Sequence, residues 1–308
     1  MATRFAACDD TPAMNKAPQP IRIDPDTINL EPLELEPEAF QSPLPIQHCG
    51  LIFEDEEIGL AVGISDTTTM QEAFGPYPGD EYITVLDGAF AMVNATGEML
   101  AAARAGDSVT FRNGAPCSWK QDGYLRKVYL TLQDPTGLMP EIALAEGAFR
   151  LLDPACAPRG DPTGDGVTRE VIFRNDAGTM TVALCTFPDR SLPLGPCPVH
   201  RLISEEISLT GPATPPDRFD AASHVFLPKG ATCAWEAMEG TVAVIVDVNA
   251  DRPQRKDATH AHLFQLGPSP SLPSGRAFKG RVCNAIRTTQ PCGIRPATAA
   301  AARLSRRD

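Results

Sequence analysis

The chain has no long apolar run, and this absence narrows where it can work. Among its 308 residues, no stretch of about 18 consecutive apolar residues occurs, so a membrane-spanning helix is excluded and we expect no membrane partner. The first ten residues also lack an apolar segment of signal-peptide length before Asp9 and Asp10. We therefore expect a cytoplasmic protein.

Several short motifs are missing as well. The chain has nine cysteines, but their number is odd, their spacing is irregular and no Cys-x-x-Cys pair occurs. Reduced thiols therefore fit the sequence better than a disulfide framework. No phosphate-binding glycine loop and no Gly-x-Ser-x-Gly motif is present, so the common nucleotide-binding and serine-hydrolase signatures are absent.

Basic residues are scarce in most of the chain. The net charge is −12, and the residues after position 250 contribute eleven Lys or Arg and three Asp or Glu, a balance of +8. Residues 1–250 therefore carry −12 − 8 = −20. A body this acidic repels phosphate backbones, so we expect no nucleic-acid partner.

Turn-forming residues are abundant, and this indicates a β fold. The 30 prolines and 24 glycines punctuate short runs in which apolar and polar residues alternate, as in all-β folds. Residues 1–45 are too rich in proline for a long helix and are predicted to form an extended N-terminal arm. From Leu125 to Leu132 the alternation puts Lys127, Tyr129 and Thr131 on one strand face and Val128 and Leu130 on the other.

The second half of the chain repeats the first. The segment beginning Val171-Ile-Phe resembles the one beginning Leu51-Ile-Phe, and Gly230-Ala-Thr-Cys-Ala-Trp resembles Gly114-Ala-Pro-Cys-Ser-Trp. The chain's two tryptophans, Trp119 and Trp235, fall at the same repeat position. Two related barrels are therefore predicted.

These patterns predict five regions, with boundaries set by shifts in composition. The second copy is expected to be degenerate, because the segment from Gly211 to His224 is short and rich in proline. The connector could hold one short helix, and the tail lacks any sustained period. The regions are the arm at 1–45, a first domain at 46–135, a connector at 136–166, a second domain at 167–250 and a basic, disordered tail at 251–308.

Two glycine-bounded motifs identify a family resemblance. Glu81 enters a strand that closes on Gly88, and a second motif runs from Gly106 to Gly114 and on to Trp119. This pair resembles the cupin signature, and its ending resembles the ethanolamine-utilisation cupins and relatives of ureidoglycine aminohydrolase. The resemblance implies an all-β fold of two tandem cupin barrels, each a double-stranded β-helix or jelly roll.

The resemblance also marks where a cupin would bind a metal ion, and most ligands are missing there. The four positions hold Gly75, Tyr77, Glu81 and Cys117 in the first copy, and Pro198, His200, Ser204 and Cys233 in the second. A stable site needs three or four ligands, so we expect no cofactor. The alternative is a divalent metal held by His200, Glu205 and Cys233.

Glu81 is the candidate catalytic residue, because the resemblance turns its side chain into the barrel. It would act as an acid or base, or as a sole carboxylate ligand; the alternative is a rim carboxylate bonded to the barrel's backbone. Cys117 is either a nucleophile or a packing residue, and Trp119 either stacks on a ligand or closes the barrel. The candidate ligand-binding residues are Tyr77, Cys117, Trp119, Lys127 and Tyr129.

Two functions therefore stay open at this stage. In the first, the protein transforms a small polar metabolite that carries a carboxylate or nitrogen-containing group, in the first barrel. In the second, it binds or senses such a metabolite without a metal and without catalysis. A scaffold role for the paired barrels is a third reading, and a homodimer is compatible with each of them.

Overall fold

The computed structural model describes most of residues 18–250 as an all-β protein. The gaps are 138, 141–146, 153–157, 189, 195, 205–206, 212–213, 220–222 and 239. Within the described residues, a single 3-10 turn, η1 (Pro37–Ala39), is the only helical segment. No helix in this part of the chain is long and apolar enough to cross a membrane. The predicted disordered tail at 251–308 lies outside the described residues.

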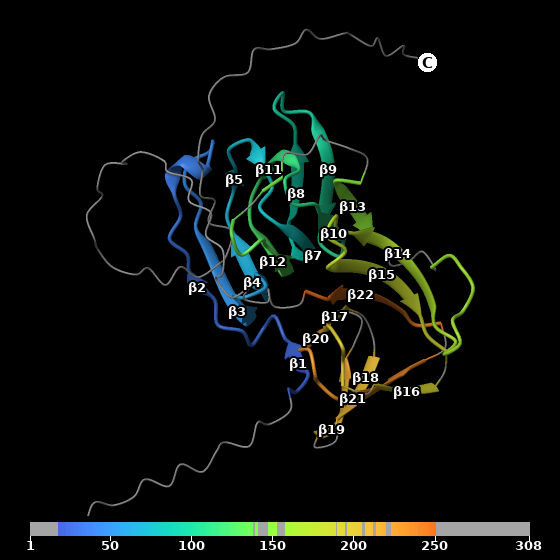
Figure 1. Cartoon of the computed structure of the whole chain (residues 1–308). Coiled ribbons are helices and arrows are strands. Elements are labelled where there is room, and N and C mark those ends of the chain that lie inside the picture. The colour runs from blue at the N-terminus through green and yellow to red at the C-terminus, as the bar shows by residue number, and fades with distance from the viewer. Residues whose placement is uncertain are drawn as a thin grey trace, which may run out of the picture.

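The first part of the chain forms two facing antiparallel sheets (Figure 1). The larger sheet runs in the order β13 (Phe149–Leu152), β10 (Ser108–Phe111), β7 (Asp80–Asp87), β12 (Leu125–Leu132), β4 (Leu60–Thr67), β3 (Gln47–Asp55) and β2 (Glu31–Pro32). The smaller sheet runs in the order β5 (Met70–Gln71), β11 (Pro116–Gln121), β8 (Ala89–Val93) and β9 (Met99–Arg104), and β6 (Gly75–Pro76) also pairs with β11. We call these two sheets the first sheet pair.

The later part of the chain forms a second sheet pair. Its larger sheet runs in the order β1 (Ile21–Ile23), β20 (His224–Leu227), β17 (His200–Ser204), β22 (Val242–Val248), β15 (Met180–Thr186) and β14 (Thr168–Arg174). Its smaller sheet runs in the order β16 (Arg190–Leu194), β21 (Cys233–Ala237), β18 (Ile207–Gly211) and β19 (Thr214–Phe219).

The two sheet pairs share one strand order. The run β3-β4-β12-β7-β10 matches β14-β15-β22-β17-β20, and β11-β8-β9 matches β21-β18-β19. Trp119 pairs with Met92 of β8, and Trp235 pairs with Leu209 of β18, so both tryptophans occupy the same place in that order. The division into two domains at the predicted boundaries stays a prediction.

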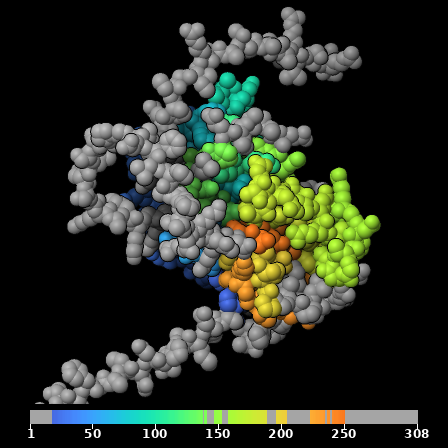
Figure 2. Space-filling view, viewed as in Figure 1, coloured from blue at the N-terminus to red at the C-terminus, as the bar shows by residue number. Residues whose placement is uncertain are grey.

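Hydrophobic side chains form three clusters, one inside each sheet pair and one between the pairs. Because side chains alternate along a strand, β12 serves two of them: Val128 and Leu130 point into the cluster between the pairs, and Tyr129 points into the first pair. From the second pair, Val182 and Val246 complete the middle cluster. The space-filling view shows the two pairs in contact (Figure 2).

Two expectations about the strands differ from the structure. The proline-rich segment after Gly211 forms strand β19, which pairs with β18, so a hairpin stands where the second copy was expected to be eroded. Strand β19 is an edge strand, and edges tolerate proline because no ladder bond is lost there. The connector, which could have held one short helix, carries strand β13 at Phe149–Leu152.

Among the described residues, the cysteines follow the expected pattern with one exception. Cys117, Cys185, Cys197 and Cys233 are free and buried. Cys49 is disulfide-bonded, so the expectation of reduced thiols throughout is wrong at that position.

Candidate functional site

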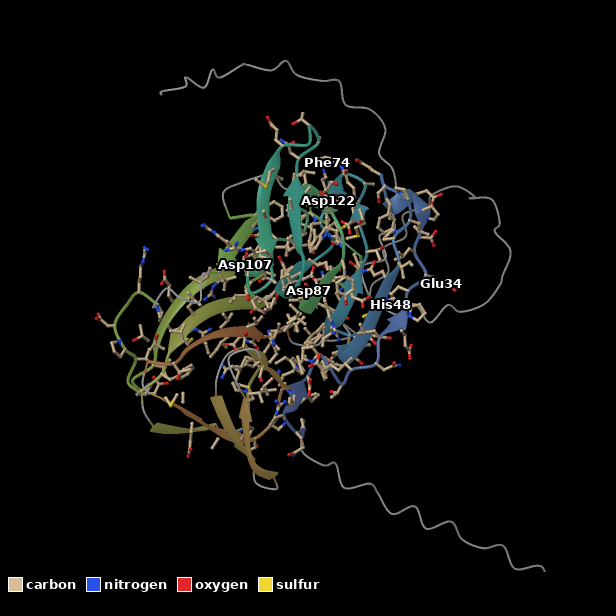
Figure 3. All side chains as sticks on the ribbon, turned by 180° about the vertical axis from the view of Figure 1, so that it is seen from behind. Glu34, His48, Phe74, Asp87, Asp107 and Asp122 are labelled. Atoms are coloured by element: carbon tan, nitrogen blue, oxygen red, sulfur yellow. The ribbon has the colours of Figure 1, made fainter. Side chains whose placement is uncertain are left out.

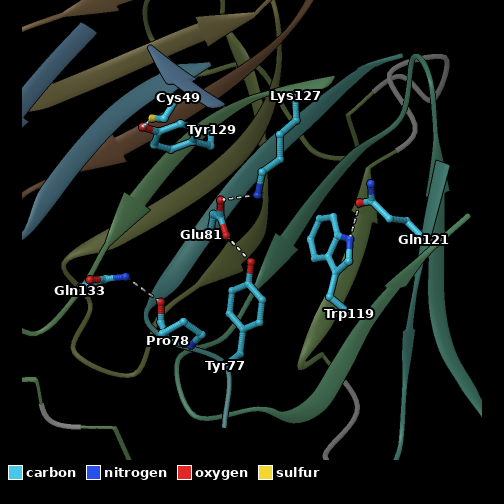
Figure 4. Close-up of polar contacts among 9 residues, drawn as sticks. All are labelled: Cys49, Tyr77, Pro78, Glu81, Trp119, Gln121, Lys127, Tyr129 and Gln133. Atoms are coloured by element: carbon cyan, nitrogen blue, oxygen red, sulfur yellow. Dashed lines mark hydrogen bonds and ion pairs between the residues drawn. The ribbon is translucent and has the colours of Figure 1, made fainter. Parts of the chain in front are cut away.

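A buried ion pair stands at the centre of the first sheet pair (Figure 4). Glu81 and Lys127 lie on the neighbouring strands β7 and β12, on the face that points between the two sheets. Lys127 Nζ lies 3.1 Å from Glu81 Oε1, and the side chains are only 8% and 1% exposed. The Tyr77 hydroxyl donates to Glu81 Oε2. Both oxygens of this carboxylate are therefore engaged by neighbouring side chains.

Trp119 holds Lys127 from the facing sheet. Phe90 stacks on the indole ring at a centroid distance of 3.8 Å, and Lys127 Nζ lies 4.8 Å from the same ring centroid. A cation over an aromatic face is attracted by the ring quadrupole, and more strongly where water is excluded. Trp119 Nε1 donates to Gln121 Oε1 at 2.8 Å. The ammonium thus sits between a carboxylate and an aromatic ring whose orientation is fixed.

Gln121 ties the two sheets together beside this ring. Its Nε2 donates to the carbonyl oxygens of Thr67, Thr68 and Gly123 at 3.2, 2.9 and 3.2 Å. Gln121 is 2% exposed, so these contacts satisfy a buried amide that would otherwise be costly. The side chain fixes the position of β11 relative to the end of β4.

A small cavity opens next to the ion pair. One wall comes from β4 and β12, the other from the β5 and β11 side, and its empty volume is about 290 Å³ including the part open to solvent. The enclosed part has room for about one water-sized group, so a ligand of a few heavy atoms would also occupy the part that is open to solvent. The lining residues are Gln47, Ser65, Asp66, Thr67, Met70, Glu72, Trp119, Gln121, Leu125 and Lys127.

Glu72 gives the cavity a group that titrates near neutral pH. Burial raises the pKa of its carboxyl from 4.5 to about 7; Lys127 opposes this rise and the negative charge of Glu81 adds to it. The backbone of Glu72 is fixed, because its N–H donates to the Trp119 carbonyl at 2.9 Å and its carbonyl accepts from Ser118 Oγ at 2.6 Å. A carboxyl with such a pKa, beside a cation in a cavity, is a candidate functional group.

Thr67 contributes a buried hydroxyl without a partner. Thr67 is 4% exposed, and its Oγ1 has no hydrogen-bond partner among the described residues. Leaving such a group unpaired costs about 1–3 kcal/mol. Because Thr67 lines the cavity, a bound molecule could satisfy this hydroxyl.

The structure brings four predicted residues together and places two others nearby. Tyr77, Glu81, Trp119 and Lys127 form the connected group described above, although only Trp119 and Lys127 line the cavity. Among the remaining predicted residues, Tyr129 Oη lies 3.0 Å from Cys49 Sγ, away from the lining. Cys117 is 4% exposed, and burial first, then Glu72, raises the pKa of its thiol to about 12. A thiol with this pKa is a poor nucleophile at neutral pH.

The alternative metal ligands of the second sheet pair do not converge. His200 stacks on Phe226, with ring centroids 6.0 Å apart, and packs on Phe53 of the first pair at 5.3 Å. Cys233 belongs to the cluster inside the second pair. Successive side chains along a strand point to opposite faces of the sheet. His200 faces the contact between the two sheet pairs, and Cys233 faces the interior of the second sheet pair. Glu205 lies outside the described residues.

The residues at the cupin ligand positions of the first pair do not fit a metal ion. Gly75 has no side chain, the Cys117 thiol stays protonated at neutral pH, and Glu81 already binds the Lys127 ammonium. Metal ions bind thiolates and free carboxylates. Within the described part of the chain, no group of three or more His, Cys, Asp or Glu could hold a metal ion.

Sequence reasoning missed Glu72, Thr67 and Gln121 as members of this site. Strand β5 contains only Met70 and Gln71, so Glu72 follows too short a strand for alternation to show where its side chain points. The alternation of side chains along β4 could have placed Thr67 on the inner face with Ser65. For Gln121 no signal stood out, because its partners are backbone carbonyls that only the folded structure brings close.

Comparison with known families supports the cupin reading for the central part of the chain. Residues 70–129 match the EutQ-like cupin domain family, and this stretch contains Glu72, Tyr77, Glu81, Trp119 and Lys127. This stretch is therefore similar to a cupin domain of this type. No curated protein matches the chain.

The similarity to solved structures extends over most of the chain. A DUF861-family protein of unknown function from Pseudomonas syringae is 17% identical, with a TM-score of 0.54 over 75% of this chain and 99% of that chain. A candidate dioxygenase from Nostoc punctiforme is 15% identical, with a TM-score of 0.52 over 80% and 88%. A cupin 2 conserved barrel domain protein from Leptotrichia buccalis is 11% identical, with a TM-score of 0.46 over 72% and 98%.

At these identities the similarity concerns the fold alone. The first two structures support the predicted all-β fold, and the family match of residues 70–129 supports its cupin type. The narrower relationship to ureidoglycine aminohydrolase, and the description as two tandem barrels, stay predictions.

Proposed function

We propose that this cupin-domain protein binds a small polar metabolite, without a metal ion, in the cavity between β4–β12 and β5–β11. The ligand class is a compound with a carboxylate, carbonyl or nitrogen-containing group. The observation that carries the proposal is the unpaired, buried hydroxyl of Thr67, a residue that lines the cavity together with Lys127. A ligand oxygen that accepts from both groups would satisfy them together.

In this proposal Glu81 holds Lys127 in place rather than reacting. Its two oxygens are occupied by Tyr77 and Lys127, and it does not line the cavity. A buried cation is stable only if it is paired. Glu81 thus keeps Lys127 charged and oriented while other faces of the ammonium stay toward the cavity.

Saturation-transfer NMR on chelator-treated protein tests the proposal with acetate, pyruvate, hydroxyacetone, acetamide and urea as probes. At least one probe should bind, and Thr67→Val should weaken its affinity about 10-fold, because one hydrogen bond of about 1–1.5 kcal/mol is lost. The matched control is Thr110→Val. Thr110 also has a buried hydroxyl without a partner, but it does not line the cavity.

The two variants separate a site effect from a stability effect. Both remove an unpaired buried hydroxyl, so neither should lower the melting temperature. Probe binding that ignores Thr67→Val, or that appears only after a divalent metal is added, would overturn the proposal.

A further inference from the structure

We propose that the cavity catalyses proton transfer at carbon, with Glu72 as the base and Lys127 and Thr67 as hydrogen-bond donors to the substrate oxygen. The substrate class is a small ketone or aldehyde with a hydrogen on the carbon next to its carbonyl group. This inference rests on the proposed function, because the substrate occupies the same cavity.

The two donors lie on one wall. In the register of β4 and β12, Lys127 pairs with Ser65 and Leu125 pairs with Thr67, so Lys127 and Thr67 are diagonal neighbours on one face. Such neighbours lie about 7–8 Å apart at the backbone, and long side chains bridge that distance. A single carbonyl oxygen can therefore meet both the ammonium and the hydroxyl.

Glu72 approaches from the other wall. Its backbone is bonded to Trp119 and Ser118 of β11, whereas Lys127 stands on β12 of the facing sheet. Its carboxyl makes no hydrogen bond within the described part of the chain, unlike that of Glu81. One carboxylate is thus committed to the lysine, and the other is left to face a substrate.

The surroundings of Glu72 suit a base that works near neutral pH. The charged and titratable groups that face it are Lys127 from β12, Glu81 from β7, Cys117 from β11 and the hydroxyl of Tyr77. Asp66 also lines the cavity, but His48 Nδ1 lies 2.7 Å from its Oδ1 and Tyr124 donates to its Oδ2. Glu72 is therefore the carboxyl with capacity to take a proton.

The proposed step is balanced without a further reactant. The Glu72 carboxylate takes the proton, the C–H bond breaks, and its electron pair forms the carbon–carbon double bond of an enolate. The former carbonyl electrons move to oxygen, where Lys127 and Thr67 stabilise the negative charge as preorganised donors do. The Glu72 carboxylic acid then returns its proton to the same carbon, and the carbonyl group forms again. A base matched to the working pH favours such a step.

Proton NMR in D₂O tests the inference on the full chain, with hydroxyacetone and pyruvate as probes. The wild type should speed the loss of the hydrogens next to the carbonyl group, and the rate should rise with pH through about 7 as Glu72 ionises. Glu72→Gln should slow this exchange at least about 100-fold, and Thr67→Val at least about 10-fold. The exposed Glu236→Gln serves as the control and should leave the rate unchanged.

Binding measured in parallel separates this inference from the proposed function. Probes that bind but do not exchange would overturn proton transfer and leave the binding site standing. Exchange that survives in a folded Glu72→Gln variant would also overturn it. If hydroxyacetone and pyruvate do not bind at all, the carbonyl class is wrong, whereas binding of acetate or urea alone would still support the broader proposal.

Discussion

Three charged side chains define the site, and their surroundings differ. Lys127 and Glu81 are nearly inaccessible and compensate each other at 3.1 Å. Within the described residues Glu72 makes no ion pair, and burial raises the pKa of its carboxyl against the opposing charge of Lys127. A buried ion pair contributes little net stability, but removing one partner costs about 3–5 kcal/mol because the other charge stays buried. The pair therefore fixes geometry, and Glu72 is free to change its charge.

The titration of Glu72 predicts a pH-dependent stability. The unfolded chain loses this proton near pH 4.5, whereas the folded protein keeps it to about pH 7. Between these values the folded state binds more protons, so this residue lowers the free energy of unfolding as the pH rises. The Glu72→Gln variant cannot ionise here, so it does not lose this stability. Its free energy of unfolding relative to that of wild type should therefore increase by about 1–3 kcal/mol between pH 4.5 and pH 8.

Urea unfolding of both proteins at the two pH values measures the effect. Glu236→Gln, on the exposed surface of β21, should show no such change. Unfolding free energies of Glu72→Gln and wild type that differ equally at pH 4.5 and pH 8 would contradict the prediction.

Part of the site could be predicted from the residues, because it depends on strand parity. Glu81 with Ile83, and Lys127 with Tyr129, lie on inner faces as the alternation predicts. Glu72 could not be placed in this way, because it follows a strand of two residues. Its position depends on the bonds that Trp119 and Ser118 of a distant strand make to its backbone.

At the scale of elements, the strands with clear alternation and turn glycines could be predicted, and the pairing partners of short edge strands could not. Strand β13 offers too few residues for a period, and its register against β10 comes from tertiary packing. Strand β19 reads as a loop because of its prolines. Surface acids such as Asp87, Asp107 and Asp122 lie around the strand ends of the first sheet pair (Figure 3). Their charges do not predict which strands pair with each other.

The turn glycine of the first motif should be more sensitive than other turn glycines. Gly88 has φ 80°, and a Cβ there would lie 2.1 Å from the Tyr124 carbonyl oxygen. Gly97 has φ 83°, but no atom lies within 4 Å of its added Cβ. Gly97→Ala should therefore cost about 1–2 kcal/mol for the left-handed backbone alone, and Gly88→Ala clearly more, because the β12 end must shift.

Thermal unfolding of the two alanine variants distinguishes these cases. Equal losses of melting temperature would mean that backbone conformation alone decides, and that the close approach of Tyr124 is relieved at no cost.

At the scale of the whole molecule, the two sheet pairs are joined by an apolar contact. Strands from the segments before and between the pairs also extend their larger sheets. The cluster between them contains Ile23 from the N-terminal segment together with strands of both pairs. Strand β1 extends the larger sheet of the second pair, and β13 extends that of the first. The turn after β14 also reaches across, because Asn175 Nδ2 donates to Asp80 Oδ2 at 2.9 Å.

The docking of the N-terminal segment predicts a large effect from a small change. Ile23 is 1% exposed, and Ile23→Ala should lower the free energy of unfolding by about 2–5 kcal/mol through lost contacts and a cavity. Ile46→Ala removes the same atoms from a side chain that is 63% exposed and should stay within about 0.5 kcal/mol of wild type. Urea unfolding measures the free energy of unfolding of both variants. A loss for Ile23→Ala as small as that for Ile46→Ala would show that β1 contributes no buried contact.

The pairing of β1 with β20 has a consequence for how the protein is made. Ile21 pairs with Phe226, so β1, the first strand of the described residues, finds its neighbour only after almost all the described chain has been synthesised. The first sheet pair needs no residue beyond β13 to complete its sheets, so it can mature while translation continues. Strand β1 must meanwhile wait in solution with Ile23 uncovered. A pairing this distant in sequence is slow to form, so we expect the docking of β1 on β20 to be a late step of folding.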